Sequence, residues 1–175
     1  MKYVFKKRYL VFLASLFDFF GGLFTLPIRV FWRSSPGNVG SILIIRLDHL
    51  GGVVCSVPVP ENLKNHYVGS RVTCLVSGQT KEIFMNNQYV DEVISYDASW
   101  FDRSQDNPFE LRSFFRLAAQ LRKYKYDLGI DLRGDLRHIL LMVLAGVKFR
   151  VGYGVTGGGF LLHRSAEYME DKHVI

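Results

Sequence analysis

From residue 41 onward, apolar and polar residues alternate in blocks of strand and helix length. The apolar run at 42–45 is rich in β-branched residues and has no polar face, which is typical of a central parallel strand covered by helices on both sides. Further strands are predicted at 71–76, 91–96, 127–132 and 150–153. Helices are predicted between them, at about 52–66, 77–87, 110–123 and 136–145. This order predicts an α/β fold, a doubly wound parallel sheet with right-handed crossovers and the 42–45 strand near its centre.

The segment 110–123 is the clearest amphipathic helix of the chain. Its apolar residues recur at helical spacing and should face the sheet: Leu111, Phe114, Phe115, Ala118 and Leu121. Arginines at 112, 116 and 122 should face away from it. The helix at 136–145 is expected to end at Gly146, which suits the left-handed conformation that follows many helices.

Residues 1–33 form a separate arm, which a linker at 34–40 joins to the α/β part. Basic residues stand at both ends of a run dense in Phe and Leu, and Asp18, Gly21-Gly22 and Pro27 interrupt that run. The pattern predicts two short amphipathic helices in a membrane interface, with aromatic side chains in the lipid and basic ones at the phosphates. A transmembrane helix and a helix packed on the protein's own core are the alternatives.

The charge of the chain is concentrated in this arm. The net charge of the whole chain is +6, and residues 1–40 hold six basic residues against one acidic residue, a net +5. Residues 41–175 hold 16 basic and 15 acidic residues, a net +1. A nucleic-acid-binding protein would carry a basic face on its folded body, so nucleic acid is not an expected partner. The arm is instead expected to meet an anionic membrane surface.

The chain has two cysteines, Cys55 and Cys74, and both lie in apolar surroundings. No spacing typical of a metal site connects cysteine or histidine residues, so no bound metal is expected. Both thiols are predicted to be buried and reduced, which fits a reducing cytosol.

Polar residues follow the 42–45 strand at once. Arg46, Asp48 and His49 come first, and the pair Gly51-Gly52 comes next. Ligands of open α/β sheets bind at the carboxyl ends of the strands, so the turn at 46–52 is the first candidate site. Asp48 could act as a base, cap the following helix or pair with Arg46, and His49 could contact a ligand or only satisfy the turn. The glycines lack the spacing of a dinucleotide-binding fingerprint, which disfavours a dehydrogenase.

A second basic pair follows the strand at 127–132. Arg133 stands at the end of that strand and Arg137 on the next helix, where they could clamp an anion. Pairing with Asp131 or Asp135 is the structural alternative. The glycines at 154 and 157–159 could form a ligand-contacting loop or only a turn.

The stretch ILIIRLDHLGGVVCSVP at 42–58 resembles the opening motif of glycosyltransferase family 9, the ADP-heptose:lipopolysaccharide heptosyltransferases. Tyr126–Gly134, Ala145–Tyr153 and the pair His173-Val174 resemble later motifs of that family, so the resemblance covers residues 41–175. It implies the N-terminal, Rossmann-like, acceptor-binding half of a two-domain GT-B glycosyltransferase. The C-terminal donor-binding domain is expected to be absent from this sequence.

The resemblance also implies roles for single residues. The family has an aspartate after the glycine of this motif, thought to be the base that activates the acceptor hydroxyl, and Gly52 stands there instead. Asp48, in the same turn, is the possible substitute. The expected acceptor-binding residues are Arg46, His49, Gly51, Ser56, Arg133 and Arg137.

The function that the resemblance implies is sugar transfer in lipopolysaccharide core biosynthesis. A nucleotide sugar such as ADP-heptose would be the donor and a lipid-linked saccharide the acceptor, with no cofactor or metal. The protein is expected in the bacterial cytoplasm, peripheral on the inner membrane. Because Gly52 replaces the family base and a donor domain is missing, the chain alone is expected to be inactive. The alternative is a membrane-associated acceptor-binding fragment without turnover.

Overall fold

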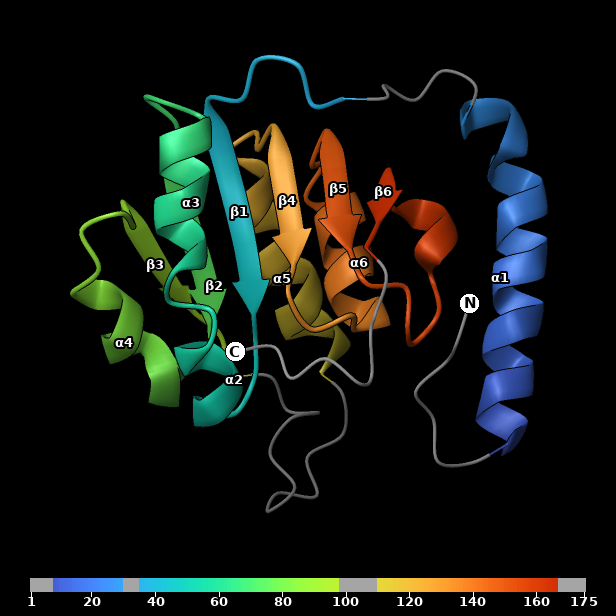
Figure 1. Ribbon diagram of the computed structural model, residues 1–175. Helices are drawn as coiled ribbons and strands as arrows, with labels where there is room; N and C mark the ends of the chain where they lie inside the picture. Colours follow the sequence, from blue (N-terminus) through green and yellow to red (C-terminus); the bar gives the residue numbers. More distant parts are fainter. Residues whose placement is uncertain (1–7, 30–34, 98–109, 167–175) are drawn as a thin grey trace.

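The computed structural model describes residues 8–29, 35–97 and 110–166, and its centre is a six-stranded, fully parallel sheet (Figure 1). The strand order is β3-β2-β1-β4-β5-β6. The strands are β1 (Ser41–Arg46), β2 (Arg71–Val76), β3 (Glu92–Ser95), β4 (Leu128–Asp131), β5 (Phe149–Gly152) and β6 (Arg164–Ser165). The helices are α1 (Arg8–Arg29), α2 (Leu50–Val54), α3 (Val59–His66), α4 (Lys81–Met85), α5 (Leu111–Arg122) and α6 (Leu136–Leu144), with 3₁₀ turns η1 (Gly78–Thr80) and η2 (Gly159–Leu161).

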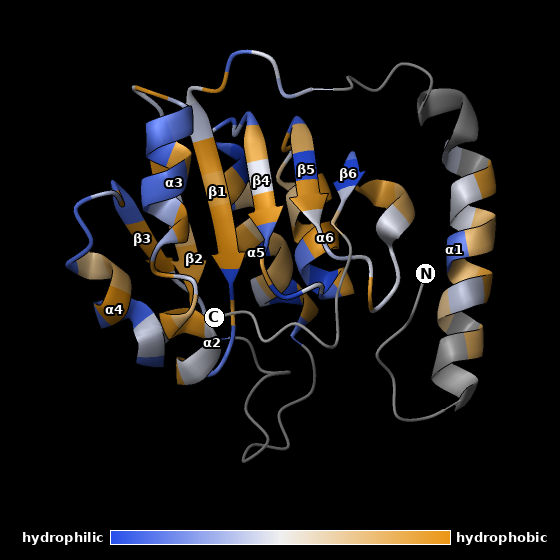
Figure 2. Cartoon of the chain, in the orientation of Figure 1, coloured by the Kyte–Doolittle hydropathy of each residue, from blue (hydrophilic) through white to orange (hydrophobic). Residues whose placement is uncertain are grey.

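The apolar strand at 42–45 lies near the centre of the sheet, as predicted. β1 pairs with β2 on one side and with β4 on the other. Leu43 and Ile45 pack into the core that α5 and α6 cover, while Ile42 and Ile44 pack into the core under α3 and α4. All four side chains are buried, and Figure 2 shows the apolar strand interior between the two helical layers. The doubly wound α/β prediction is therefore confirmed.

Several helices differ from their predicted form. The helix expected at about 52–66 is divided into α2 and α3, because Pro58 stands before the first residue of α3 and proline cannot continue a helix from the preceding turn. In α5 the buried face is formed by Phe114, Leu117, Ala118 and Leu121. Leu111 and Phe115 are 58% and 54% exposed, so their assignment to the core was wrong.

The two cysteines differ from each other. Cys74 is buried in β2, but Cys55 follows α2 in the turn before α3 and is exposed, so the prediction of two buried thiols was wrong for Cys55. Burial raises the pKa of the Cys74 thiol to about 12.

A thiol-specific chromogenic disulfide reagent should distinguish the two cysteines. Because the thiolate is the reacting form, we expect one thiol, Cys55, to react in the folded protein and a second only in denaturant. Cys55→Ser should abolish the reaction of the folded protein. Equal reaction rates of both thiols in the folded protein would contradict the buried position of Cys74.

The N-terminal arm is one continuous helix, α1, of 22 residues, and not two short helices. Two of the residues that interrupt the apolar run, Asp18 and Gly21, serve the docking of this helix against the domain. The Asp18 carboxylate accepts a hydrogen bond from the Gly158 amide at 2.6 Å, and a Cβ on Gly21 would lie 2.2 Å from the Phe160 ring. α1 thus packs on η2 beside the β6 edge (Figure 1), which is the packed-helix alternative. Within the described residues, no helix combines the length and the apolar character needed to cross a membrane.

Candidate functional site

The turns that follow β1 and β4 meet at the carboxyl edge of the sheet. These strands are neighbours, and the chain order reverses between them, since β2 and β3 lie beyond β1 and β5 and β6 beyond β4. Two arginines predicted from the sequence cross-link the turns. Arg46, from β1, donates to the carbonyl of Leu132 after β4, and Arg133 Nη1 donates at 2.7 Å to the carbonyl of Leu47 after β1. The crevice at such a reversal point is where open α/β sheets bind ligands.

Asp48 lies over Gly52, the position at which the resemblance expects an aspartate. Asp48 Oδ2 is 3.1 Å from Arg46 Nη2, and Arg46 Nε donates at 3.1 Å to the Gly52 carbonyl. A Cβ on residue 52 would lie 2.5 Å from both Arg46 Nη2 and Asp48 Oδ2. The absence of a side chain at residue 52 therefore leaves room for this ion pair, and the Asp48 carboxylate is held next to the place from which a side chain of residue 52 would project.

The other predicted residues of the β1 turn have different surroundings. Asp48 Oδ1 accepts from the His49 amide at 2.8 Å, and α2 has no side-chain cap, so Asp48 pairs with Arg46 rather than capping that helix. His49 and Gly51 are exposed at the edge of the turn. Ser56 is buried and donates at 2.9 Å to the Gly52 carbonyl, so its hydroxyl stabilises the turn.

The turn after β4 is organised around the buried carboxylate of Asp131. Its two oxygens accept hydrogen bonds from the amides of Arg133, Gly134 and Asp135 at 2.9–3.1 Å. Gly134 has φ +80°, and a Cβ there would lie 2.7 Å from the Val155 side chain, so the tight turn requires glycine. His138 on α6 places Nδ1 2.9 Å from Asp131 Oδ1, and both side chains are fully buried.

Arg133 and Arg137 do not form a symmetrical clamp. Arg137 makes a two-point pair with Asp135, with Nε–Oδ1 at 2.9 Å and Nη2–Oδ2 at 2.6 Å. Burial of Asp135 opposes its ionisation, but the bonds and charges of Arg137, together with the charge of His138, outweigh that effect and lower its pKa. Arg133 instead lies between the two turns, with Nη1 4.0 Å from Asp48 Oδ1 and its side chain 31% exposed. Of the two arginines, Arg133 is the one at the junction.

Sequence reasoning missed two residues that support this junction. His138 was not singled out, although a histidine near the start of an otherwise apolar helix is a signal for a buried polar contact. Thr156 Oγ1 donates at 2.7 Å to the Gly134 carbonyl and accepts from the Leu136 amide at 2.8 Å. This hydroxyl fixes the glycine-rich loop at 154–159 against the β4 turn.

The described part of the chain holds no group of three or more His, Cys, Asp or Glu residues arranged to bind a metal ion. The chemistry available at the junction is that of one carboxylate, Asp48, beside two guanidinium groups, those of Arg46 and Arg133. Such a set can accept a proton from a hydroxyl and bind a carboxylate or phosphate.

No protein-family model and no curated protein matches this chain. Solved structures do match its fold. Escherichia coli ADP-heptose lipopolysaccharide heptosyltransferase II is 18% identical with a TM-score of 0.62, over 75% of this chain and 36% of that one. A glycosyltransferase family 9 structure from Veillonella parvula is 20% identical with a TM-score of 0.61, over 73% of this chain and 36% of that one. The E. coli heptosyltransferase WaaC with ADP is 16% identical with a TM-score of 0.59, over 77% of this chain and 43% of that one.

The predicted likeness to heptosyltransferases is therefore confirmed at the level of the fold. The chain shares the parallel α/β architecture of these proteins and spans less than half of the length of each of them. A shared fold alone does not show that this chain has the activity or the substrates of the complete proteins.

Proposed function

We propose that this chain is the acceptor-binding half of a glycosyltransferase that acts on lipopolysaccharide-type saccharides. The observation that carries the proposal is the junction of the β1 and β4 turns. There a carboxylate and two arginines gather at the carboxyl edge of a fold shared with heptosyltransferases. The donor would be a nucleotide sugar such as ADP-heptose, bound by a second, donor-side half. The acceptor would be a lipid-linked saccharide on the cytoplasmic face of the bacterial inner membrane.

In the proposed reaction, an acceptor hydroxyl attacks the anomeric carbon of the donor. The new glycosidic bond forms as the bond from that carbon to the diphosphate breaks, and the nucleoside diphosphate leaves. Asp48 accepts the proton of the hydroxyl, which a positioned base must do for the oxygen to attack. Arg46 holds the Asp48 carboxylate over Gly52. Arg133 binds an anionic group of the acceptor, because lipopolysaccharide core saccharides carry carboxylates and phosphates.

A second function is favoured by Gly52 itself. If the carboxylate must project from residue 52, the chain binds the acceptor but does not transfer sugar. The binding role is common to both functions, and only the role of Asp48 separates them.

We expect Arg133→Met to weaken binding of an anionic acceptor. The probe is a lipopolysaccharide core oligosaccharide with its acyl chains removed, and binding is measured by isothermal titration calorimetry. A charge-assisted hydrogen bond contributes about 1.5–3 kcal/mol, so the Kd should rise roughly 10- to 100-fold.

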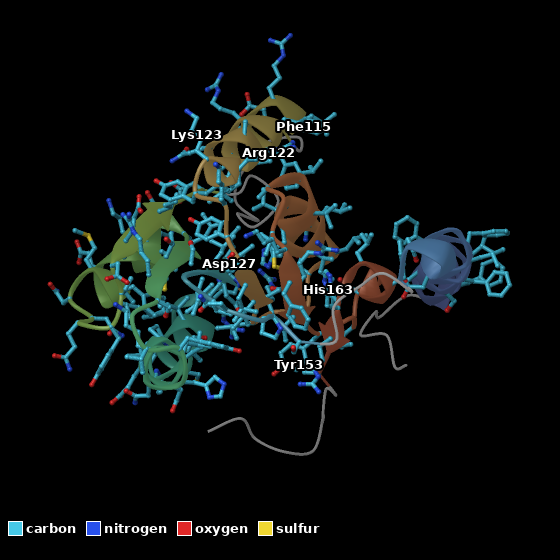
Figure 3. The ribbon with its side chains drawn as sticks, turned by 90° about the horizontal axis from the view of Figure 1, so that it is seen from above. Phe115, Arg122, Lys123, Asp127, Tyr153 and His163 are labelled. Carbon is cyan, nitrogen blue, oxygen red and sulfur yellow. The ribbon has the colours of Figure 1, made fainter. Side chains whose placement is uncertain are left out.

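The matched control is Arg122→Met, at the exposed C-terminal end of α5 (Figure 3), where the chain leads to the start of β4, at the edge of the sheet opposite the junction. It should leave the Kd unchanged. Arg133 also donates to the Leu47 carbonyl, so its loss could disturb the turn. The NMR spectrum of the backbone amides of Arg133→Met must therefore first show that the fold is intact. Equal affinity of a folded Arg133→Met variant and the unchanged protein would contradict the assignment.

A further inference from the structure

Helix α1 is amphipathic, but the face that contacts the domain is not its apolar face, unlike in a helix that covers a core. Three of its small or polar residues face the domain. Ala14 lies close to Gly157, Asp18 bonds the Gly158 amide, and Gly21 accommodates the ring of Phe160. Phe17 makes an edge-on ring contact with Phe160, with 5.3 Å between ring centroids. Without a large apolar side chain at residue 21, the helix can approach η2 this closely.

Five large apolar residues of α1 face outward. They form one exposed stripe, with 42–67% of each residue accessible: Phe12, Leu16, Phe19, Phe20 and Leu23. At about 100° per residue, this stripe lies on the opposite side of the helix from Ala14, Asp18 and Gly21. Figure 3, which looks along the helix, shows side chains on α1 projecting away from the domain. A contiguous apolar surface of this kind marks an interaction site.

The charges of the arm indicate what covers the stripe. Four basic residues precede or begin the helix, at 2, 6, 7 and 8, and two more stand at 29 and 33. The one acidic residue of the arm, Asp18, is turned toward Gly158. A second copy of the helix would bring like charges together in either orientation. A lipid surface with anionic headgroups would receive the apolar stripe and the basic ends together.

We propose that the outward stripe of α1 is a membrane-binding platform, fixed to the domain rather than tethered to it. The docked face joins the platform to the candidate site through a short path. Gly158 bonds Asp18, and Thr156, two residues earlier, bonds Gly134 in the β4 turn. The bilayer would thus hold the site at a constant orientation to the lipid surface. This inference deepens the proposed function, on which its use for a lipid-linked acceptor rests, but membrane binding itself needs no acceptor.

The lipid-facing stripe is tested by sedimentation of the full chain with acceptor-free vesicles. Phosphatidylcholine vesicles are compared with vesicles that also contain phosphatidylglycerol. Phe19→Gln and Phe20→Gln should each lower the partition coefficient about tenfold, close to the contribution of one buried aromatic side chain. Glutamine keeps a good helix propensity, so the helix itself is preserved. The unchanged protein should prefer the anionic vesicles, and raised salt should weaken that preference without abolishing binding.

The matched control is Phe115→Gln, which removes an equally exposed aromatic ring from α5, on a different side of the molecule (Figure 3). Its partition should equal that of the unchanged protein. Loss of binding by Phe115→Gln alone would place the lipid-facing surface on α5 and overturn the proposal. A dimer in lipid-free buffer that Phe19→Gln converts to a monomer, with no vesicle binding, would assign the stripe to a second copy and also overturn it.

The fixed attachment is tested by hydrogen–deuterium exchange of residues 154–162. Gly21→Leu forces a side chain into the Phe160 ring, whereas Gly22→Leu adds the same side chain where a Cβ has no neighbour within 4 Å. Gly21→Leu should speed exchange of this segment by freeing the Gly158 amide, and Gly22→Leu should not. Vesicles should leave the slow exchange of the unchanged protein intact. Exchange that accelerates on vesicles to the rate of Gly21→Leu would mean that α1 leaves the domain, and the fixed platform would be wrong.

Both tests use no saccharide, so they separate this inference from the proposed function. If the unchanged protein binds the oligosaccharide but not the vesicles, the platform alone is refuted. If the unchanged protein binds the vesicles but not the oligosaccharide, the acceptor site is refuted and the platform stands.

Discussion

Asp131→Ala is expected to lower the free energy of unfolding by about 3–5 kcal/mol, the range found when one partner of a buried polar pair is removed. The Asp131 carboxylate bonds three backbone amides and the His138 ring in a fully buried position. Alanine would leave all of these groups without their acceptor, and each unsatisfied buried group costs about 1–3 kcal/mol before the chain relaxes. Urea unfolding, followed by circular dichroism, measures the change.

Asp127→Ala is the matched control for this substitution. Asp127 also bonds two backbone amides, those of Gly40 and Ser41, and pairs with Lys148, but it lies at the opposite edge of the sheet and is partly exposed. Water can replace its bonds, so the expected loss is about 1–2 kcal/mol. Asp131→Asn, which keeps one acceptor oxygen, should fall between the two. Similar losses for Asp131→Ala and Asp127→Ala would contradict the central role of Asp131 in the turn.

The sheet could be predicted because its signals are local. Four consecutive apolar residues at 42–45 are compatible with burial on both faces, and the alternation with helices then fixes parallel pairing. Parallel strands end at a shared edge, so the pattern places the turns after β1 and β4 at the same edge, but the contact of Asp48 with Arg133 was not predicted. The two-residue strand β6 lies in a segment without an apolar run, so no local pattern predicted it.

The misses depend on partners far away in the sequence. Asp18 and Gly21 are typical helix breakers within the arm, but their partners are Gly158 and Phe160. No local sequence pattern shows these long-range contacts. In the folded protein they stabilise α1 as one continuous helix. His138 carried a sequence signal for a buried polar contact, but its partner Asp131 could not be predicted, because only the folded turn after β4 brings the two side chains together. For Cys55, a division between α2 and α3 placed the thiol in an exposed turn rather than in a buried helix.

The role of Asp48 has the largest expected effect on activity. A chimera is made in which residues 1–175 precede the donor-binding half of a heptosyltransferase, and sugar transfer from ADP-heptose to a lipopolysaccharide core acceptor is measured. Asp48→Asn should lower kcat about 10²–10⁴-fold, the usual contribution of a positioned general base. Glu82→Gln, exposed on α4, is the control and should leave the rate unchanged.

A paired substitution tests whether the position of the carboxylate is what matters. Gly52→Asp alone must displace the Arg46–Asp48 pair, since its Cβ would lie 2.5 Å from both side chains. In the background of Asp48→Ala the carboxylate is gone, and of the two close neighbours only the Arg46 guanidinium remains, at the end of a flexible side chain that can shift. The chimera with both Asp48→Ala and Gly52→Asp should therefore be about tenfold or more faster than the chimera with Asp48→Ala alone. A carboxylate at residue 52 would then supply part of the contribution of a general base.

The rate of the Asp48→Asn chimera, relative to the unchanged chimera, is the most direct test of the catalytic junction between the β1 and β4 turns. The proposed function predicts an active unchanged chimera and a loss of about 10²–10⁴-fold in the variant. Equal rates of the two chimeras would contradict Asp48 as the base. An inactive unchanged chimera that Gly52→Asp activates would show that the chain, as its sequence stands, binds acceptor without transferring sugar.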